Sequence, residues 1–140
     1  MAAEPTLPLR EGVVIVLQRE TRFLVGQRAA HKTAGGYWTQ VSGRLEPGES
    51  QQQTVVREAM EELGCIVRPL QKLQERPSAN GQFLLHYWRA EIVEGEPAIC
   101  DDENQELRWL TVAELRSLSP IFQEDVDLFE SLLQEVNQRG

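Results

Sequence analysis

The segment SQQQTVVREAMEELG, residues 50–64, constrains the fold more than any other part of the sequence. Ser50 suits a helix N-cap, and Gln53 three residues later completes a capping-box pattern. Gly64 suits the C′ position, where a left-handed backbone ends a helix. At about 100° per residue, one side of the helix collects the apolar side chains Val55, Val56, Ala59, Met60 and Leu63. We therefore expect an amphipathic helix over 50–63 that packs this face against a sheet.

Segments rich in β-branched and aromatic residues lie on both sides of this helix. Residues 12–20 and 22–28 are expected to pair as a hairpin, because only a short polar break separates them. The other predicted strands are 37–41, 65–76, 82–93 and 106–110, and two further helices are predicted over 112–118 and 124–138. Because hairpins replace a regular βα alternation, we expect an α/β fold with a mixed sheet and helices on its faces.

The length of 140 residues suits one domain, 1–140. Cys65 and Cys100 show neither zinc-site spacing nor a disulfide framework, which favours a reducing compartment. The N-terminus has no apolar signal core, and no aliphatic run is long enough to cross a bilayer. We therefore expect a cytoplasmic protein with no membrane partner.

The net charge of −8 restricts the partners of the chain. General nucleic-acid binding depends on Lys and Arg that meet phosphates, so an acidic chain is poorly suited to it. A phosphorylated small molecule remains compatible with this charge if divalent cations bridge the two. A homodimer is possible from the sequence.

Three glutamates gather on a separate arc of the predicted helix. Glu58, Glu61 and Glu62 are related as i, i+3 and i+4, which makes them neighbours that repel one another. No lysine lies between Gly43 and Cys65 to offset them. A hard divalent cation removes the repulsion, because Mg²⁺ prefers carboxylate oxygen and water. The alternative is a solvated acidic face, and the helix alone does not decide between the two.

The loop before the helix decides in favour of a site. From Gly43 to Cys65 the sequence reads GRLEPGESQQQTVVREAMEELGC, which resembles the Nudix box, G-x5-E-x7-R-E-U-x-E-E-x-G-U with U an aliphatic residue. All the fixed glycine, glutamate and arginine positions match, while Ala59 and Cys65 replace aliphatic residues by small apolar ones. The resemblance implies an α/β/α sandwich with a mixed sheet. It also implies hydrolysis of a pyrophosphate bond in a nucleoside diphosphate or triphosphate derivative, with Mg²⁺ or Mn²⁺.

The resemblance also assigns roles within the box. Glu58 and Glu62 are expected as metal ligands, and Glu61 as a further ligand or as the base that activates water, a role that Glu58 shares. Gly43 is expected to present its backbone carbonyl to the metal from a loop, residues 43–49, that approaches closely. Arg57 is expected to orient Glu49 and Glu61 through charge-assisted hydrogen bonds.

Residues outside the box complete the expected site. The family often supplies a further glutamate from a late loop, and Glu103 in CDDENQELRW is the first choice, with Asp102 and Glu106 as competitors and an acidic turn as the alternative. The loop before the box offers candidates for substrate binding: Arg28, His31 and Lys32 for phosphates and Tyr37 for stacking on a base. A solvated basic loop and a core aromatic are the alternatives for these four residues.

The prediction of the substrate rests only on motifs of other subfamilies that this sequence lacks. The proline of ADP-ribose hydrolases, the tyrosine of dinucleoside polyphosphate hydrolases and the SQPWPFP motif of NADH-type enzymes are not at their expected positions. We therefore expect a MutT-like nucleoside triphosphate pyrophosphatase. The alternatives are an ADP-ribose or dinucleotide hydrolase, a dihydroneopterin triphosphate hydrolase, and a module that senses a nucleotide without cleaving it.

Overall fold

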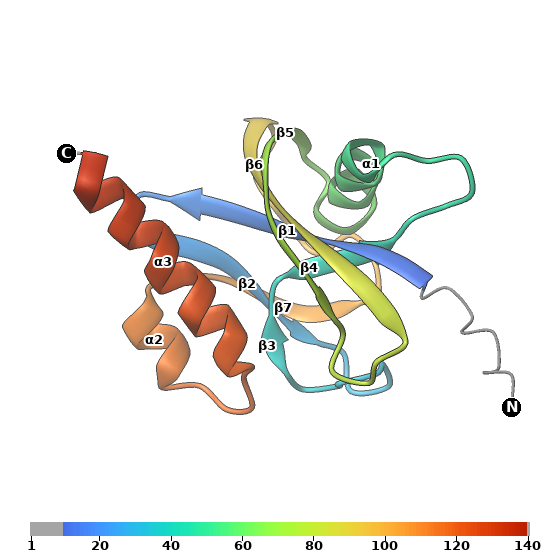
Figure 1. The fold of residues 1–140 in the computed structure, drawn as a ribbon. Helices are drawn as coiled ribbons and strands as arrows, with labels where there is room; N and C mark the ends of the chain where they lie inside the picture. The colour runs from blue at the N-terminus through green and yellow to red at the C-terminus, as the bar shows by residue number, and fades with distance from the viewer. Residues whose placement is uncertain (1–9, 140) are drawn as a thin grey trace, which may run out of the picture.

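The computed structural model describes residues 10–139, and these form three layers (Figure 1). A seven-stranded mixed sheet separates helix α1 from helices α2 and α3. This confirms the predicted α/β/α sandwich. The strands are β1 (Arg10–Arg19), β2 (Arg22–Arg28), β3 (Trp38–Thr39), β4 (Val41–Arg44), β5 (Ile66–Pro77), β6 (Phe83–Glu94) and β7 (Asn104–Leu110). The helices are α1 (Gln51–Leu63), α2 (Val112–Arg116) and α3 (Gln123–Arg139).

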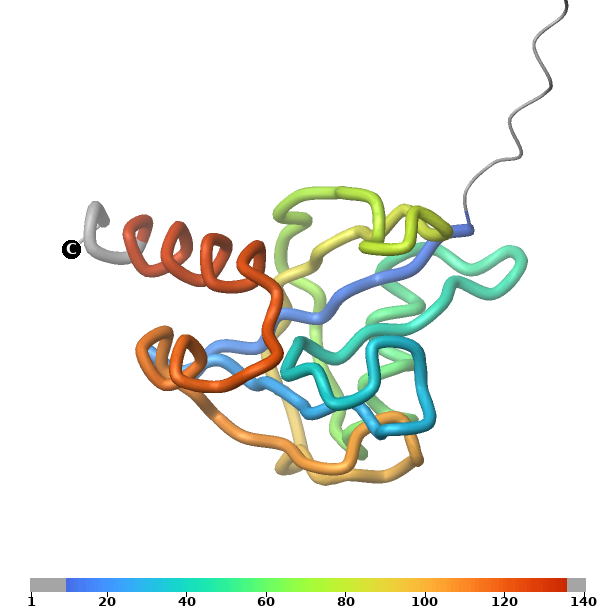
Figure 2. Tube along the Cα trace, turned by 90° about the horizontal axis from the view of Figure 1, so that it is seen from below, coloured from blue at the N-terminus to red at the C-terminus, as the bar shows by residue number. Residues whose placement is uncertain are grey.

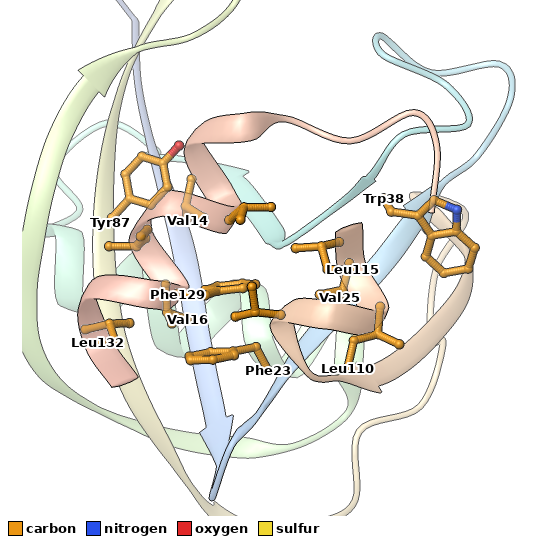
Figure 3. Packing of buried hydrophobic residues seen from close by; sticks show 13 residues of the cluster. Val14, Val16, Phe23, Val25, Trp38, Tyr87, Leu110, Leu115, Phe129 and Leu132 are labelled. Carbon is orange, nitrogen blue, oxygen red and sulfur yellow. The ribbon is translucent and has the colours of Figure 1, made fainter. Parts of the chain in front are cut away.

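Strand β1 divides the hydrophobic core into two parts. Successive strand residues point to opposite faces of a sheet. From residue 13 to residue 17, the odd-numbered side chains therefore pack toward α1 and the even-numbered ones toward α3. On the α3 side, the rings of Phe23 and Phe129 stack with centroids 4.0 Å apart (Figure 3). Both faces of the central strand are buried, which fixes its register.

Strand β1 changes its pairing partner along its length on one side, from β4 to β2. One side of β1 runs parallel to β6, which in turn pairs with β5. The other side pairs with β4 through residues 12–15 and with β2 through residues 18 and 19, both antiparallel. Strands β4 and β2 therefore diverge from a common partner, and the functional site described below lies along β4.

The strand expected over 37–41 is wrong in its extent. The structure has two short strands there, with β3 paired to β2 and β4 paired to β1. Gln40 lies between them, where the chain passes from one part of the sheet to the other. The loop expected from Gly43 begins only after Arg44, because Gly43 pairs with Val13 in the sheet. Gln40 and Gly43 thus lie at either end of one short extended segment.

The apolar face expected for α1 is also partly wrong. Val56 and Met60 are 40% and 47% exposed, whereas Glu62 is only 3% exposed. The buried arc is rotated toward the carboxylates, because the sheet meets the helix from the side of Val55, Ala59 and Glu62 rather than from the centre of the apolar residues. The Ser50–Gln53 capping box and the left-handed Gly64, at φ 68°, are both present.

No helix within residues 10–139 has both the length and the apolar character needed to cross a membrane.

Candidate active site

A cleft of about 980 Å³ runs along β4, between α1, the β5–β6 turn and the segment before β7. The loop between β2 and β3 lies beside that segment (Figure 2), and the backbone nitrogen of Ala29 donates to the carbonyl of Glu103 at 2.9 Å. These loops come from distant parts of the sequence and share one wall of the cleft. The cleft is large enough for a ligand of nucleotide size.

Arg57 connects most of the acidic residues at one end of the cleft. Its Nε and Nη2 donate to the two carboxylate oxygens of Glu49 at 2.7 and 2.9 Å, and its Nη1 donates to Glu58 at 2.9 Å and to Glu61 at 3.1 Å. A further bond from Nη2 reaches the carbonyl of Arg44 at 2.8 Å. The bidentate pair lowers the pKa of Glu49 to about 2 and raises that of Arg57. This network fixes the loop before α1 against the helix.

The backbone at Gly43 lies directly against the side chain of Glu58. A Cβ atom added to Gly43 would come within 2.1 Å of the carboxyl carbon of Glu58, far closer than real contacts allow. Glycine is therefore required here because of the close approach of a neighbouring carboxylate. Burial is the main cause that raises the pKa of Glu58, while Arg57 opposes the rise.

Glu62 is the most buried carboxylate of the helix, and its charge is poorly compensated. It is 3% exposed, and its Oε2 atom has no hydrogen-bond partner among the described residues. Burial raises its pKa to about 9, and the charges of Glu58, Asp101 and Glu103 add to the rise. A buried carboxylate surrounded by like charges is typical of a functional site, because a purely structural position favours a neutral side chain.

The segment before β7 places a further carboxylate near Glu62. Its backbone is held by the end of α1, since the nitrogen of Cys100 donates to the carbonyl of Glu62 at 3.1 Å. Asp101 lies in the cleft, and burial and the charge of Glu103 both raise its pKa. Asp101 was missed in the sequence, although it stands beside Asp102 in the same acidic stretch. Only the fold distinguishes which of these neighbouring acids points inward.

The other acids of this segment have different surroundings. Glu103 lines the cleft, but it lies 3.1 Å from Nζ of Lys32 and 3.7 Å from Nη2 of Arg28. Asp102 is exposed and lies 3.4 Å from His31. Glu106 is also outside the cleft lining, and its carboxylate accepts from Arg108. Glu103 thus sits between the basic and the acidic groups of the cleft.

The four candidates for substrate binding divide into two pairs. Arg28 and Lys32 line the cleft. His31 does not, and its side chain is 62% exposed. Tyr37 is also outside the lining, and its ring stacks on Phe122 with centroids 4.5 Å apart.

The acidic end of the cleft has the donor set for a hard divalent cation. The unpartnered Oε2 of Glu62, the space that a Cβ at Gly43 would fill, and the mutual repulsion of Glu58, Glu62 and Asp101 all fit a positive charge bound among oxygen atoms. Within residues 10–139, however, no three acidic, histidine or cysteine side chains are arranged as a ready-made metal cage. Glu58 instead points to Arg57, so a cation would have to draw the carboxylates together.

Comparisons with known proteins identify the family of the chain. The NUDIX domain family model matches residues 8–132. A CTP pyrophosphohydrolase of Escherichia coli K12 is 30% identical over 125 residues, which cover 88% of this chain and 90% of that protein. The NAD-capped RNA hydrolase NudC of Salmonella paratyphi C is 33% identical over 108 residues, or 77% of this chain, and the chain spans only 41% of NudC.

Among solved structures, a NUDIX hydrolase from Nitrosomonas europaea superposes with a TM-score of 0.75 at 21% identity. The match covers 95% of this chain and 74% of that one, and at this identity it shows the fold alone. The family model, by contrast, spans most of the chain, including the loop, helix and acidic segment that form the cleft. The chain therefore belongs to the Nudix hydrolase family.

Proposed function

We propose that this protein hydrolyses a pyrophosphate bond in a nucleoside triphosphate, releasing a nucleoside monophosphate and pyrophosphate, with Mg²⁺ or Mn²⁺ bound at the acidic end of the cleft. One observation carries the proposal: Glu62 is a buried carboxylate with an unpartnered oxygen, placed beside two further acids. Such an arrangement costs stability unless a cation compensates it. The similarity to a CTP pyrophosphohydrolase over nearly the full chain supports the same class of reaction.

The candidate ligands of the cation are Glu58, Glu62, the carbonyl of Gly43 and Asp101. Glu61 and Glu103 are further candidates; Arg57 contacts Glu61, as it does Glu58, and Lys32 contacts Glu103. When bound, a divalent cation neutralises phosphate oxygens and lowers the pKa of water. The acidic protein can in this way bind a polyanion.

The protein groups supply orientation and proton transfer. Arg28 and Lys32 face the cleft and provide positive charge for the phosphate chain. Arg57 orients Glu58 and Glu61, and either carboxylate can take the proton from the attacking water. As the new phosphorus–oxygen bond forms, the bridging oxygen leaves with pyrophosphate. Which of the two glutamates accepts the proton is tested by replacing each with glutamine.

The decisive experiment replaces Glu62 by glutamine. Glutamine has nearly the size and shape of glutamate and carries no charge, so we expect it to be tolerated at this buried position. The wild type is assayed for phosphate or pyrophosphate release from nucleoside triphosphates, oxidised nucleotides, ADP-ribose, NADH, dinucleoside polyphosphates and capped RNA, each with Mg²⁺ and with Mn²⁺. For the best substrate, we expect Glu62→Gln to lower kcat by about a thousandfold. Glu94→Gln, on an exposed strand end, is the matched control and is expected to leave kcat unchanged.

A second readout separates cation binding from catalysis. Mg²⁺ or Mn²⁺ is expected to raise the Tm of the wild type and of Glu94→Gln, but not that of Glu62→Gln. Full turnover by Glu62→Gln would overturn the proposed site. Hydrolysis of ADP-ribose or a dinucleotide in preference to every triphosphate would keep the site and change the substrate class. Saturable nucleotide binding without any turnover would favour a sensing module.

A further inference from the structure

The two cysteines of the chain, Cys65 and Cys100, are far apart in the sequence and come together at the end of helix α1. Both are free thiols. Cys65 is 0% exposed and belongs to the part of the core between α1 and the sheet, whereas Cys100 is exposed in the segment before β7. The fold thus places an accessible thiol beside a buried one, and the proposed reaction uses neither.

The segment between β6 and β7 covers Cys65 and holds Cys100 next to it. A Cβ atom added to Gly95 would lie 3.3 Å from the Cα and Cβ atoms of Cys65. One added to Gly64 would lie 2.8 Å from Sγ of Cys100, so this sulfur packs against the backbone of the residue that precedes Cys65. Burial raises the pKa of the Cys65 thiol and the charge of Cys100 raises it further, as expected for neighbouring sulfur atoms.

The backbone around Cys100 also supports the proposed cation site. The nitrogen of Cys100 donates to the carbonyl of Glu62 at 3.1 Å, and the nitrogen of Ala98 donates to the carbonyl of Leu63 at 3.0 Å. Asp101, which lines the cleft, is the next residue in the chain. The position of Cys100 against the end of α1 therefore determines where Asp101 lies relative to Glu62.

We propose that Cys65 and Cys100 form a redox pair, which a peroxide oxidises to a disulfide that shifts the segment before β7 and lowers the activity of the cleft. The formation of the disulfide is independent of the reaction. Its effect on activity rests on the proposed function, because it acts on the same cation site.

The oxidation takes two steps and consumes one peroxide. The exposed Cys100 sulfur attacks a peroxide oxygen, the oxygen–oxygen bond breaks, and a sulfenic acid forms while water leaves when the oxidant is hydrogen peroxide. The Cys65 sulfur then displaces the hydroxyl group of the sulfenic acid, which leaves as a second water with the proton of the Cys65 thiol. The two thiols together lose two electrons, and the peroxide gains them.

The disulfide is expected to disturb the cation site because of where the two thiols are attached. A disulfide requires its sulfur atoms to lie about 2.05 Å apart, so the Cys100 sulfur must turn away from Gly64 toward Cys65. Cys65 is fixed in the core, and the movement therefore falls on the exposed segment. This weakens the hydrogen bond from Cys100 to the carbonyl of Glu62 and displaces Asp101. A misplacement of about 1 Å costs up to about a hundredfold in rate.

Counting thiols tests the pair without any assay of activity. The reduced full-length protein is treated with hydrogen peroxide, unfolded in N-ethylmaleimide and weighed by mass spectrometry. We expect the wild type to lose both alkylation sites together while it stays a single chain, and dithiothreitol to restore both. Cys100→Ser should leave Cys65 open to alkylation, and in Cys65→Ala dimedone should trap the sulfenic acid of Cys100. A wild type that keeps both thiols, or that links through Cys100 to a second chain, overturns the pair.

Steady-state kinetics on the best substrate, with Mg²⁺, tests the effect on the cleft. We expect peroxide to lower kcat of the wild type by about tenfold or more, and dithiothreitol to recover it. Cys100→Ser is the matched control and should keep the kcat of the reduced wild type before and after peroxide. A disulfide that leaves kcat unchanged, or an equal loss in Cys100→Ser, overturns the proposed control of activity. A disulfide that forms in a protein without any turnover supports the pair and overturns the proposed function instead.

Discussion

The two ends of the cleft are built in different ways. At the acidic end, Glu49, Arg57, Glu58 and Glu62 come from one short stretch of sequence, and the guanidinium of Arg57 bonds to both Glu49 and Glu58. At the opposite end, Gln40 and Asp125 are far apart in the sequence and meet only because α3 packs against the sheet beside the junction of β3 and β4. The first end has a fixed spacing that a reader of the sequence can recognise, and the second has none.

The largest effect is expected from removing the guanidinium that organises the acidic end. Arg57→Ala leaves Glu49 and Glu58 largely buried without their partner, and such losses cost about 3 kcal/mol or more in the free energy of unfolding. We also expect kcat to fall by about a hundredfold or more, since Glu58 and Glu61 lose their orientation. Urea unfolding and steady-state kinetics measure the two losses.

Arg57→Lys separates charge from geometry in the same network. Lysine keeps the positive charge but cannot make the bidentate pair with Glu49 and also reach Glu58 and the Arg44 carbonyl. It should therefore recover part of the lost stability while kcat stays low. Full activity in Arg57→Lys would show that the fork of hydrogen bonds is not needed.

A smaller effect is expected at Gly43, where only the position of one carboxylate changes. Gly43→Ala pushes a methyl group into the Glu58 carboxyl, so we expect kcat to fall by about tenfold to a hundredfold. The matched control is Gly48→Ala, where nothing lies within 4 Å of the added Cβ but φ is +79°. That backbone costs about 1 kcal/mol of stability and should leave kcat unchanged. Equal losses of kcat in both variants would mean that Gly43 acts through backbone conformation alone.

The same contrast explains how far the sequence could predict the molecule. Helix α1 could be predicted because its caps and its carboxylate spacing are local, and the strands followed from short-range pattern. The buried face of α1 was predicted incorrectly. Periodicity shows which side chains share a face of the helix, but it does not show from which side the sheet packs against the helix. The sheet buries Glu62 and leaves Met60 exposed. Asp101 and Gln40 were missed because their burial depends on tertiary contacts with α1 and α3. Single domain, homodimer and cytoplasmic location stay predictions.

At the opposite end, neutralising the buried acid is expected to stabilise the protein. Burial raises the pKa of Asp125 from 3.8 to about 6, so the folded state holds a proton that the unfolded state has released between these pH values. The unfolding free energy therefore falls as pH rises from about 4 to about 6, and the penalty persists above pH 6. Asp125→Asn avoids this penalty and should be more stable than the wild type by about 3 kcal/mol at pH 7.5.

Urea unfolding at several pH values tests this sign. The stability difference between Asp125→Asn and the wild type should shrink toward zero near pH 4, where both side chains are neutral. Asp127→Asn, as the exposed control, should show little change over the same range. A difference that does not vary with pH would mean that the Asp125 carboxylate is compensated at neutral pH, contrary to its burial.

The smallest effect is expected for His31, which was predicted from the sequence to bind substrate but lies outside the cleft lining in the structure. His31 and Lys32 are adjacent, yet only Lys32 lines the cleft, where its ammonium lies 3.1 Å from Glu103. Lys32→Met should raise the KM for a triphosphate by about tenfold, because one positive charge near the phosphates is lost. His31→Gln should change this KM by less than about twofold, since the His31 side chain is 62% exposed and contacts Asp102, which is also exposed. A larger effect from His31 than from Lys32 would mean that the β2–β3 loop closes over bound substrate and brings the imidazole to the phosphates, in which case the cleft seen here is the open form of the site.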